Sequence, residues 1–299
     1  MASPVHLIGA NGRSGQAIAR ALMAEGETVI PVIRAPEKLP DDLRTSARVA
    51  DLEDACALAT ALADATRIVS TAHARSIPAI LDAAPQTACL IALGSTRKFT
   101  RWPDAHGNGV LAGEAALLAS GRKGMILHPT MIYGAQGEDN VQRLAALLKR
   151  LPVIPLPNGG RSLVQPIYQD DVTRAVIAAL SLAASGQIIG PESLVIAGPQ
   201  AVSYRGFIEA ILAAAGLGKR VFLPVPGGIL EFLAPLAARL PGLPSIGRAE
   251  IRRLLEDKAF PVAPMTTRLG FAPIPLQDGL ARLFASSCDA APLAHGSRP

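Results

Sequence analysis

Seven residues near the amino end, Gly9 to Gly15, constrain the fold of this chain more than any other segment. They read G-A-N-G-R-S-G between the apolar run Val5–Ile8 and a helix-period segment, Ser14–Ala24. Glycines at this spacing let a strand turn sharply into a helix, bring the backbone close to a pyrophosphate and pack the helix against the sheet. The start of the helix then presents unpaired N–H groups to the phosphates. The loop therefore predicts dinucleotide binding, and the alternative is a glycine-rich turn without a ligand. Its candidate cofactor-binding residues are Gly9, Asn11, Gly12, Arg13, Ser14 and Gly15.

Short apolar runs alternate with helix-period segments from residue 5 to about residue 128. The expected strands are Val5–Ile8, Thr28–Arg34, Arg48–Ala50, Arg67–Thr71, Cys89–Leu93 and Met125–His128. The expected helices between them are Ser14–Ala24, Leu52–Asp64, Ile77–Ala84 and Val110–Ala119. This alternation is typical of parallel strands joined by right-handed helical crossovers. It predicts an α/β fold of the Rossmann type, a doubly wound sheet in the order 3-2-1-4-5-6.

The pattern changes after Pro129, where prolines and glycines indicate a region rich in loops. We expect residues 1–160 to form the NAD(P)-binding domain, with a strand and helix at about 163–184 returning to it. Residues 185–287 are predicted to form a smaller α+β cap for the substrate, and residues 288–299 a disordered tail. The elements expected in the cap are strands Leu194–Ala197 and Arg220–Leu223 and helices Tyr204–Ala215, Ile229–Leu240, Ala249–Leu255 and Leu276–Phe284.

Composition narrows the function classes. The 299 residues are 49% hydrophobic, 18% charged and 4% aromatic, as in a globular protein with an aliphatic core. Three cysteines without metal-type spacing predict reduced thiols in a cytoplasmic protein and no metal site. The formal charge of +5 is dispersed and aromatic residues are scarce, which argues against nucleic acid as a partner. Charged residues and prolines interrupt the apolar stretch 227–243, so it is too broken to span a membrane, and binding at a membrane surface is disfavoured.

The end of the second expected strand bears on the choice of cofactor. NAD-binding proteins place a carboxylate there against the ribose 2′-hydroxyl, whereas NADP-binding proteins tend to place an arginine. Here Arg34 follows the strand and no carboxylate ends it. Arg34 and Arg13 together predict a clamp on a 2′-phosphate, which favours NADP and leaves NAD as the alternative. The competing interpretation is that both arginines are solvated surface charges.

Several motifs follow one another as in the short-chain dehydrogenase/reductase superfamily. They are Gly9–Gly15, Arg34–Lys38, Ala50–Leu52, Ser70–Ala72, His128–Gly134 and Gln165–Val172. The chain resembles the NAD-dependent epimerase/dehydratase family, in an atypical extended branch similar to the NADPH-binding accessory subunit of respiratory complex I. The resemblance spans residue 5 to about residue 285. Taken together, these motifs identify a superfamily, but they say much less about which reaction the protein catalyses.

This resemblance assigns roles to several further residues. It implies that Asp51 and Leu52 contact the adenine and that Ser70, Thr71 and Ala72 line the cofactor. It also implies that Pro129, Thr130 and Tyr133 close over the nicotinamide. Simpler alternatives exist, because Asp51 could cap a helix that begins at Leu52 and Pro129 could end a strand. We interpret Asp170 and Asp171 as a helix cap and a first-turn charge.

The catalytic pair of the family, Tyr-x-x-x-Lys on the helix after the fifth strand, is missing. His106 stands at the tyrosine position and Val110 at the lysine position. Valine cannot lower the pKa of a neighbour, so the mechanism of the family does not carry over. Ser95 and Thr96 remain as hydroxyls that could bind a carbonyl or sugar oxygen. The candidate proton donors are Lys98, His106, His73 and Tyr133, each of which could instead be an ordinary solvated or hydrogen-bonded group.

Two functions remain open. The first, which we favour, is an enzyme: an NADP-binding oxidoreductase or epimerase. Its substrate would be a small molecule with a carbonyl or hydroxyl group, such as a nucleotide sugar. The second is a non-catalytic NADP(H)-binding sensor or assembly protein without the Tyr/Lys pair. A monomer or homodimer is expected. The substrate is expected between the sheet edge and the cap, near Asn140, Arg143, Asn158, Arg161 and Gln165.

Overall fold

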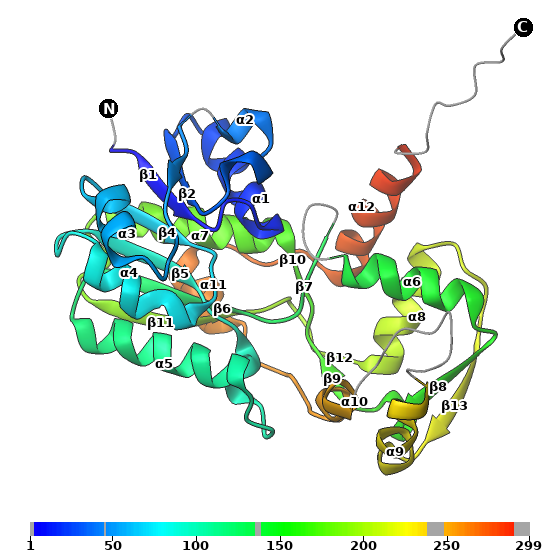
Figure 1. Ribbon diagram of the computed structural model, residues 1–299. Helices are drawn as coiled ribbons and strands as arrows, with labels where there is room; N and C mark the ends of the chain where they lie inside the picture. The colour runs from blue at the N-terminus through cyan, green and yellow to red at the C-terminus, as the bar shows by residue number, and fades with distance from the viewer. Residues whose placement is uncertain (1–2, 45, 135–138, 238–247, 290–299) are drawn as a thin grey trace, which may run out of the picture.

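Seven parallel strands form the central sheet of the protein, in the order β3-β2-β1-β4-β5-β6-β11. The computed structural model describes residues 3–44, 46–134, 139–237 and 248–289 (Figure 1). The strands are β1 (Val5–Ile8), β2 (Val29–Ile33), β3 (Arg48–Val49), β4 (Arg67–Ser70), β5 (Cys89–Leu93), β6 (Gly124–Pro129) and β11 (Pro191–Ile196). The predicted Rossmann-type order of six strands is thus confirmed, and β11 adds a seventh.

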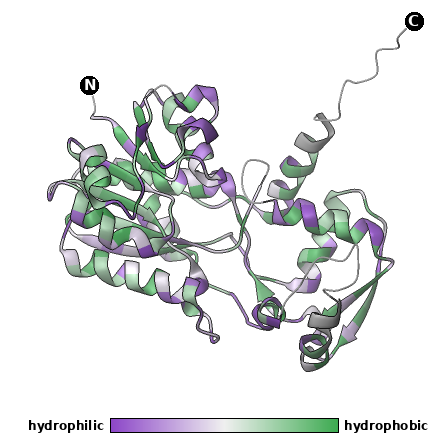
Figure 2. Cartoon of the chain, viewed as in Figure 1, coloured by the Kyte–Doolittle hydropathy of each residue, from purple (hydrophilic) through white to green (hydrophobic). Residues whose placement is uncertain are grey.

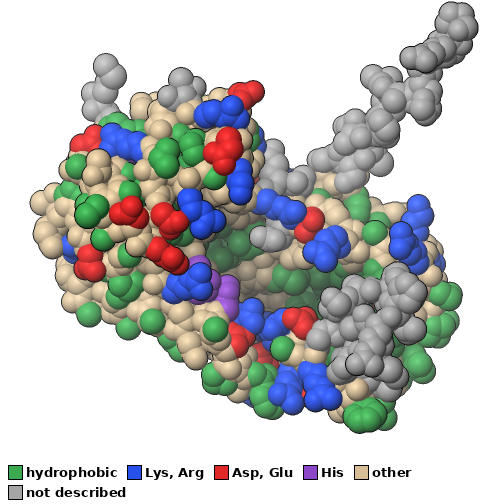
Figure 3. All heavy atoms as spheres, viewed as in Figure 1, with side chains coloured by type: hydrophobic (Ala, Val, Ile, Leu, Met, Phe, Trp, Pro, Cys, Tyr) green, Lys and Arg blue, Asp and Glu red, His purple; other side chains and the backbone are tan. Residues whose placement is uncertain are grey.

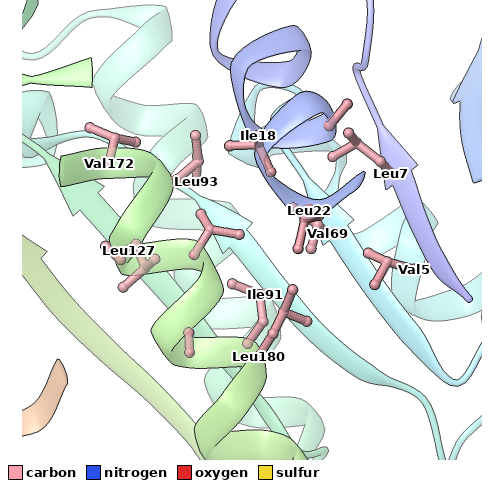
Figure 4. Packing of buried hydrophobic residues seen from close by; sticks show 14 of the residues in the cluster. Val5, Leu7, Ile18, Leu22, Val69, Ile91, Leu93, Leu127, Val172 and Leu180 are labelled. Carbon is pink, nitrogen blue, oxygen red and sulfur yellow. The ribbon is translucent and has the colours of Figure 1, made fainter. Parts of the chain in front are cut away.

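Helices cover both faces of this sheet. Helices α1 (Arg13–Ala24), α7 (Gln169–Ala184) and α11 (Ala263–Leu269) pack on one face, where α2 (Asp41–Arg44) adds Leu43 to the cluster. Helices α3 (Ala55–Leu62), α4 (Ile77–Ala83) and α5 (Ala105–Ser120) pack on the other. Figure 4 shows Ile18 of α1 and Val172 of α7 against strand residues such as Val69 and Leu127. Because side chains alternate along a strand, β1 sends Leu7 into the first cluster and Ile8 into the second.

A second, smaller lobe carries its own core. Its helices are α6 (Asn140–Arg150), α8 (Tyr204–Ala214), α9 (Gly227–Ala237), α10 (Arg248–Leu254) and α12 (Leu276–Asp289). Three small sheets pair β7 (Ile132–Tyr133) with β10 (Ile167–Tyr168), β9 (Leu163–Val164) with β12 (Val202–Ser203), and β8 (Val153–Pro157) with β13 (Val221–Val225). Phe207 and Ile211 of α8 pack there against Val141 of α6 and Leu280 of α12. Figure 2 shows this apolar interior apart from that of the large sheet.

Four 3-10 turns complete the described elements. They are η1 (Pro36–Lys38), η2 (Ala74–Ser76), η3 (Thr96–Phe99) and η4 (Asn158–Gly160). Turns η2 and η3 follow β4 and β5, so they lie at the carboxyl edge of the sheet, where open α/β sheets bind ligands. None of the helices within the described ranges has the length and apolar character that a membrane span requires.

Several sequence predictions need correction. The strand expected in the cap at Leu194–Ala197 is part of β11 and belongs to the large sheet, because it pairs with β6. Helix α5 begins at Ala105, five residues before the predicted start, since Asp104 caps it by accepting a hydrogen bond from Gly107 N at 2.8 Å. Helices α6 and α11 were not predicted. Residues 288 and 289 of the predicted tail lie in α12, and residues 290–299 lie outside the described residues. Residues 238–240 of the helix predicted at Ile229–Leu240 also lie outside the described residues.

Candidate functional site

Two adjoining hollows lie at the carboxyl edge of the large sheet. The central cleft, about 690 Å³, is lined by the loops after β4, β5 and β6 and by the end of α10 with the segment that follows it, residues 253–260. The second hollow, about 590 Å³, lies between the glycine loop and the end of β2, and we call it the Arg34 pocket. Thr71 and Ala72 line both hollows and so join them. Figure 3 shows the space between the two lobes, with histidine and basic side chains at its rim.

The glycine loop is built by close backbone contacts that exclude side chains. A Cβ at Gly15 would lie 2.3 Å from Gly9 O, and a Cβ at Gly9 would lie 2.6 Å from Thr71 Oγ1. Gly9 also has a φ of 83°, which disfavours other residues. Within the described residues no side chain caps α1, and its first turn holds no acidic residue. The N–H groups at this helix start are therefore free of side-chain acceptors, as a phosphate site requires.

The Arg34 pocket brings together three basic residues and two acidic ones, Asp51 and Glu53. Arg34 Nη1 lies 3.6 Å from Asp51 Oδ2, and the Arg34 side chain is 77% exposed. Lys38 and Arg75 line the same pocket, and neither was singled out from the sequence. Asp51 does not cap α3, because Asp54 does so by accepting a hydrogen bond from Ala57 N at 3.0 Å. Leu52, Asn11, Gly9 and Gly12 also line the pocket.

Arg13 does not join Arg34. Its guanidinium forms an ion pair with Asp139, with Arg13 Nη1 2.9 Å from Asp139 Oδ1, and it does not line the Arg34 pocket. The structure therefore does not bring the two arginines of the predicted clamp together. Arg75, which follows β4, supplies a second guanidinium instead. No local pattern indicates this, because Arg75 lies some forty residues from Arg34 and only the fold brings both to one hollow.

Most of the predicted residues at the ends of β4 and β6 line the central cleft, but Ser70 and Tyr133 do not. Pro129 and Thr130 lie in its wall, while Ser70 is 1% exposed inside β4 and lines neither hollow. Thr130 Oγ1 is buried, and no hydrogen-bond partner for it occurs among the described residues. A buried hydroxyl left unpaired in a cleft wall is a natural partner for a ligand amide.

Ser95 is held in place at the end of β5. Its N–H donates to His128 Nδ1 at 3.2 Å, and its Oγ accepts from Arg97 N at 3.1 Å. Because Oγ accepts from the backbone, the Ser95 hydroxyl proton is available to donate into the cleft. The neighbouring Thr96 Oγ1 donates to Pro129 O at 3.2 Å, and both residues line the cleft. Ser14 lines it too, and its hydroxyl donates to Gln169 Oε1 at 2.8 Å.

Two histidines meet at the cleft wall. The rings of His73 and His106 touch edge to face with centroids 4.4 Å apart. Burial and nearby arginines lower the pKa of His73, and burial, His73 and Arg97 lower the pKa of His106. Both imidazoles are therefore neutral at pH 7. Val110, at the position where the family has lysine, is 1% exposed and lines the same cleft.

Lys98 and Tyr133 are not brought to the cleft. Lys98 Nζ lies 2.5 Å from Glu114 Oε1 in an ion pair whose side chains are 8% and 13% exposed. Tyr133 is fully buried, and its hydroxyl donates to Leu276 O at 3.3 Å beneath α12. Burial raises the pKa of the Tyr133 hydroxyl well above its usual range. Neither side chain lines the cleft.

The remaining predicted positions have structural roles. Asp171 accepts a hydrogen bond from Ile274 N at 2.7 Å, and Tyr168, not Asp170, is the N-cap residue of α7. Of the residues expected near the substrate, Asn140 lines the cleft, while Gln165 is buried and binds the backbone of Phe260. Residues 256–260, which follow α10 and supply part of the cleft wall, were missed because nothing in their sequence distinguishes them from a surface loop.

Comparisons with known proteins agree with this geometry. Residues 9–106 match a family model described as NAD(P)H-binding. No curated protein sequence matches the chain significantly. An NADPH-dependent quinone oxidoreductase from Escherichia coli, solved with NADPH, is similar in structure, with a TM-score of 0.73 and 16% identity over 94% of this chain and 99% of that chain.

Two epimerases are also similar in structure. A nucleoside-diphosphate-sugar epimerase from Staphylococcus aureus has a TM-score of 0.71 and 19% identity, over 93% of this chain and 100% of that chain. A UDP-glucuronic acid 4-epimerase from Bacillus cereus, in complex with UDP-glucuronic acid and NAD, has a TM-score of 0.70 and 16% identity, over 97% and 100%. The resemblance to the complex I subunit stays a prediction. Residues 9–106 thus match an NAD(P)H-binding family model, and the chain shares the Rossmann-type α/β fold of these solved structures.

Proposed function

We propose that this protein is an NADP(H)-dependent reductase that binds a small carbonyl substrate in the central cleft. One observation carries the proposal: the Ser95 hydroxyl, anchored by His128 and Arg97, lines a cleft that continues into the pocket beside the glycine loop. In such a cleft the hydroxyl can donate a hydrogen bond to a carbonyl oxygen. His106 lines the same wall and offers a second contact to that oxygen.

The residues present fit a dinucleotide along its length. The uncapped start of α1 and the closely packed Gly9 and Gly15 suit the diphosphate. Asp51 and Leu52 suit the adenosine half, and the unpaired Thr130 hydroxyl suits the nicotinamide carboxamide. When bound, a reduced nicotinamide would supply the hydride, and the protein would supply position, hydrogen bonds and a proton.

The Arg34 pocket supports NADP(H) over NAD(H). A ribose 2′-phosphate carries negative charge, and Arg34, Lys38 and Arg75 supply three cationic groups around the pocket. Arg34 forms a long ion pair with Asp51, with 3.6 Å between Asp51 Oδ2 and Arg34 Nη1. An ion pair this long at an exposed site is weak, so Arg34 can turn to a phosphate at little cost.

Turnover with simple carbonyl probes tests the proposal. The wild-type protein is mixed with NADPH and with 9,10-phenanthrenequinone, 4-nitrobenzaldehyde or pyruvate, and loss of NADPH absorbance is followed. We expect at least one probe to be reduced, and Ser95→Ala to lower kcat/KM by roughly 10- to 100-fold through the lost hydrogen bond. Ser120→Ala, on the far end of α5, is the matched control and should leave kcat/KM unchanged.

A second candidate, an NADP(H)-binding protein without turnover, rests on Val110. This buried side chain replaces the lysine of the family's catalytic pair. A sensor would bind NADPH and show a raised melting temperature, yet oxidise no NADPH with any of the three probes. Binding combined with turnover excludes it.

A further inference from the structure

Lys258 lies in the wall of the central cleft, and its backbone is firmly held. Its N–H donates to Leu163 O of β9 at 2.8 Å. Two residues later, Phe260 N donates to Gln165 Oε1 at 2.7 Å, and Gln165 Nε2 donates back to Phe260 O at 3.2 Å. These hydrogen bonds fix the backbone of the loop from which the Lys258 side chain reaches the cleft.

The Lys258 ammonium has charged neighbours but no bonded partner. Within the described part of the chain, no ion pair or hydrogen bond involves Lys258 Nζ. The nearby Glu256 carboxylate is 8% exposed and accepts from Thr100 Oγ1, at 2.9 and 3.0 Å, and from Arg101 N at 2.6 Å. Burial and then the charges of Arg253 and Arg97 lower the pKa of Lys258, against an opposing effect of Glu256.

The other groups in the cleft are poor acids. The lowered pKa values of His73 and His106 leave both rings without an extra proton at pH 7. The Ser95 hydroxyl can donate a hydrogen bond but gives up its proton only at high pH. Lys98 is paired with Glu114 outside the cleft. Lys258 is half-buried and its pKa is lowered, so its ammonium is a better acid than that of an ordinary lysine.

We propose that Lys258 is the proton donor of the reduction, a role that rests on the proposed function. The Nζ–H bond breaks as an O–H bond forms on the substrate oxygen, while the hydride supplied by the reduced dinucleotide adds to the carbonyl carbon. The carbonyl is reduced by two electrons to an alcohol, and the dinucleotide is oxidised. The neutral amine of Lys258 then takes a proton from water.

A direct titration tests the acidity of Lys258 without turnover. The six lysines are methylated reductively with ¹³C-formaldehyde, and the Lys258 signal is identified by its absence in Lys258→Arg. We expect its pKa to lie below the ordinary value for lysine, and Glu256→Gln to lower it further because a neighbouring negative charge is lost. A Lys258 signal that titrates at the ordinary lysine value would overturn the proposal.

Kinetics test the role itself, using whichever of the three carbonyl probes the wild-type protein reduces fastest. Lys258→Ala should lower kcat by about 10²- to 10⁴-fold, abolish the alkaline limb of the pH profile and leave the Kd for NADPH unchanged. Added ethylammonium should restore part of the lost kcat, which a merely structural lysine would not allow. Lys219→Ala is the matched control and should match the wild type.

The outcomes separate the two proposals. Full turnover in Lys258→Ala, or a loss that ethylammonium does not rescue, overturns the role of Lys258 and leaves the proposed reductase standing. Absence of turnover in the wild-type protein with all three probes overturns the reductase, and the proton donor with it.

Discussion

His128 Nδ1 accepts a hydrogen bond from Ser95 N at 3.2 Å, and this contact ties the wall of the central cleft to the buried interior. His128 is wholly buried in β6, and its Nε2 lies 3.3 Å from Glu114 Oε1. The His128 ring packs directly against the backbone of Gly94, because a Cβ at Gly94 would lie 2.3 Å from His128 Nδ1. The position of Ser95 therefore depends on a histidine that never reaches the cleft.

This histidine predicts a loss of stability in acid. Burial lowers the pKa of His128 from 6.5 to about 4. Below pH 6.5 this histidine binds a proton in the unfolded chain but stays neutral in the folded chain, so the free energy of unfolding falls as the pH drops toward 4. The shift in the His128 pKa corresponds to a loss of about 3 kcal/mol in the free energy of unfolding once the pH lies below 4. Urea unfolding at pH 7, 5.5 and 4.5 should show this fall, and His128→Asn should reduce it; equal pH dependence in both proteins would contradict the prediction.

Lys98 is expected to support the fold rather than the chemistry. Burial would raise the pKa of Glu114, but hydrogen bonds from Lys98 and Ser193 outweigh it and hold the pKa low. Lys98→Met leaves this carboxylate without its cation and should cost roughly 3 kcal/mol of unfolding free energy. The double variant Lys98→Met/Glu114→Gln should regain part of that loss. Unchanged stability in Lys98→Met would refute this role.

The glycine loop should tolerate no side chain at residue 15. A Cβ there would lie 2.3 Å from Gly9 O, so Gly15→Ala must displace the loop and is expected to lower the unfolding free energy by about 1–3 kcal/mol. It should also weaken NADPH binding, measured by calorimetry. Gly190→Ala is the control, since nothing lies within 4 Å of its added Cβ. Wild-type affinity in Gly15→Ala would show that the loop does not contact the cofactor.

Arg34 and Arg13 should differ in their effect on cofactor choice. Arg34→Ala removes a guanidinium from the pocket, and the Kd for NADPH should rise roughly 10- to 100-fold while that for NADH changes little. Arg13→Ala should leave the ratio of the two Kd values unchanged, because Arg13 is paired with Asp139 outside the pocket. The reverse pattern would restore the original clamp of Arg13 and Arg34.

Much of the large sheet was predictable from the sequence, for a physical reason. Strands β1 and β5 are short and buried at every residue, so Val5–Ile8 and Cys89–Leu93 were placed to the residue. Strand β11 was assigned to the wrong lobe because partners in a parallel sheet are distant in sequence, and only packing brings Leu194 beside Leu127. The start of α5 was missed because Gly107 and Gly109 have low helix propensity.

The cleft residues that follow strands of the large sheet were predictable from the sequence. Those that come from the second lobe were not. Thr71, Ser95 and Thr130 all end or follow strands of the sheet and line the cleft. Lys98 follows β5 as well, but its side chain turns to Glu114, a choice that depends on burial and not on position in the sequence. Lys258 enters from a loop more than 150 residues beyond Ser95, and no local pattern marks it.

Calorimetric titration of the wild-type protein with NADPH tests the central claim most directly, with NADH and the two oxidised forms titrated alongside. We expect saturable binding of NADPH at one site per chain, tighter than that of NADH. Absence of heat with all four dinucleotides, together with an unchanged melting temperature, would contradict cofactor binding at the glycine loop.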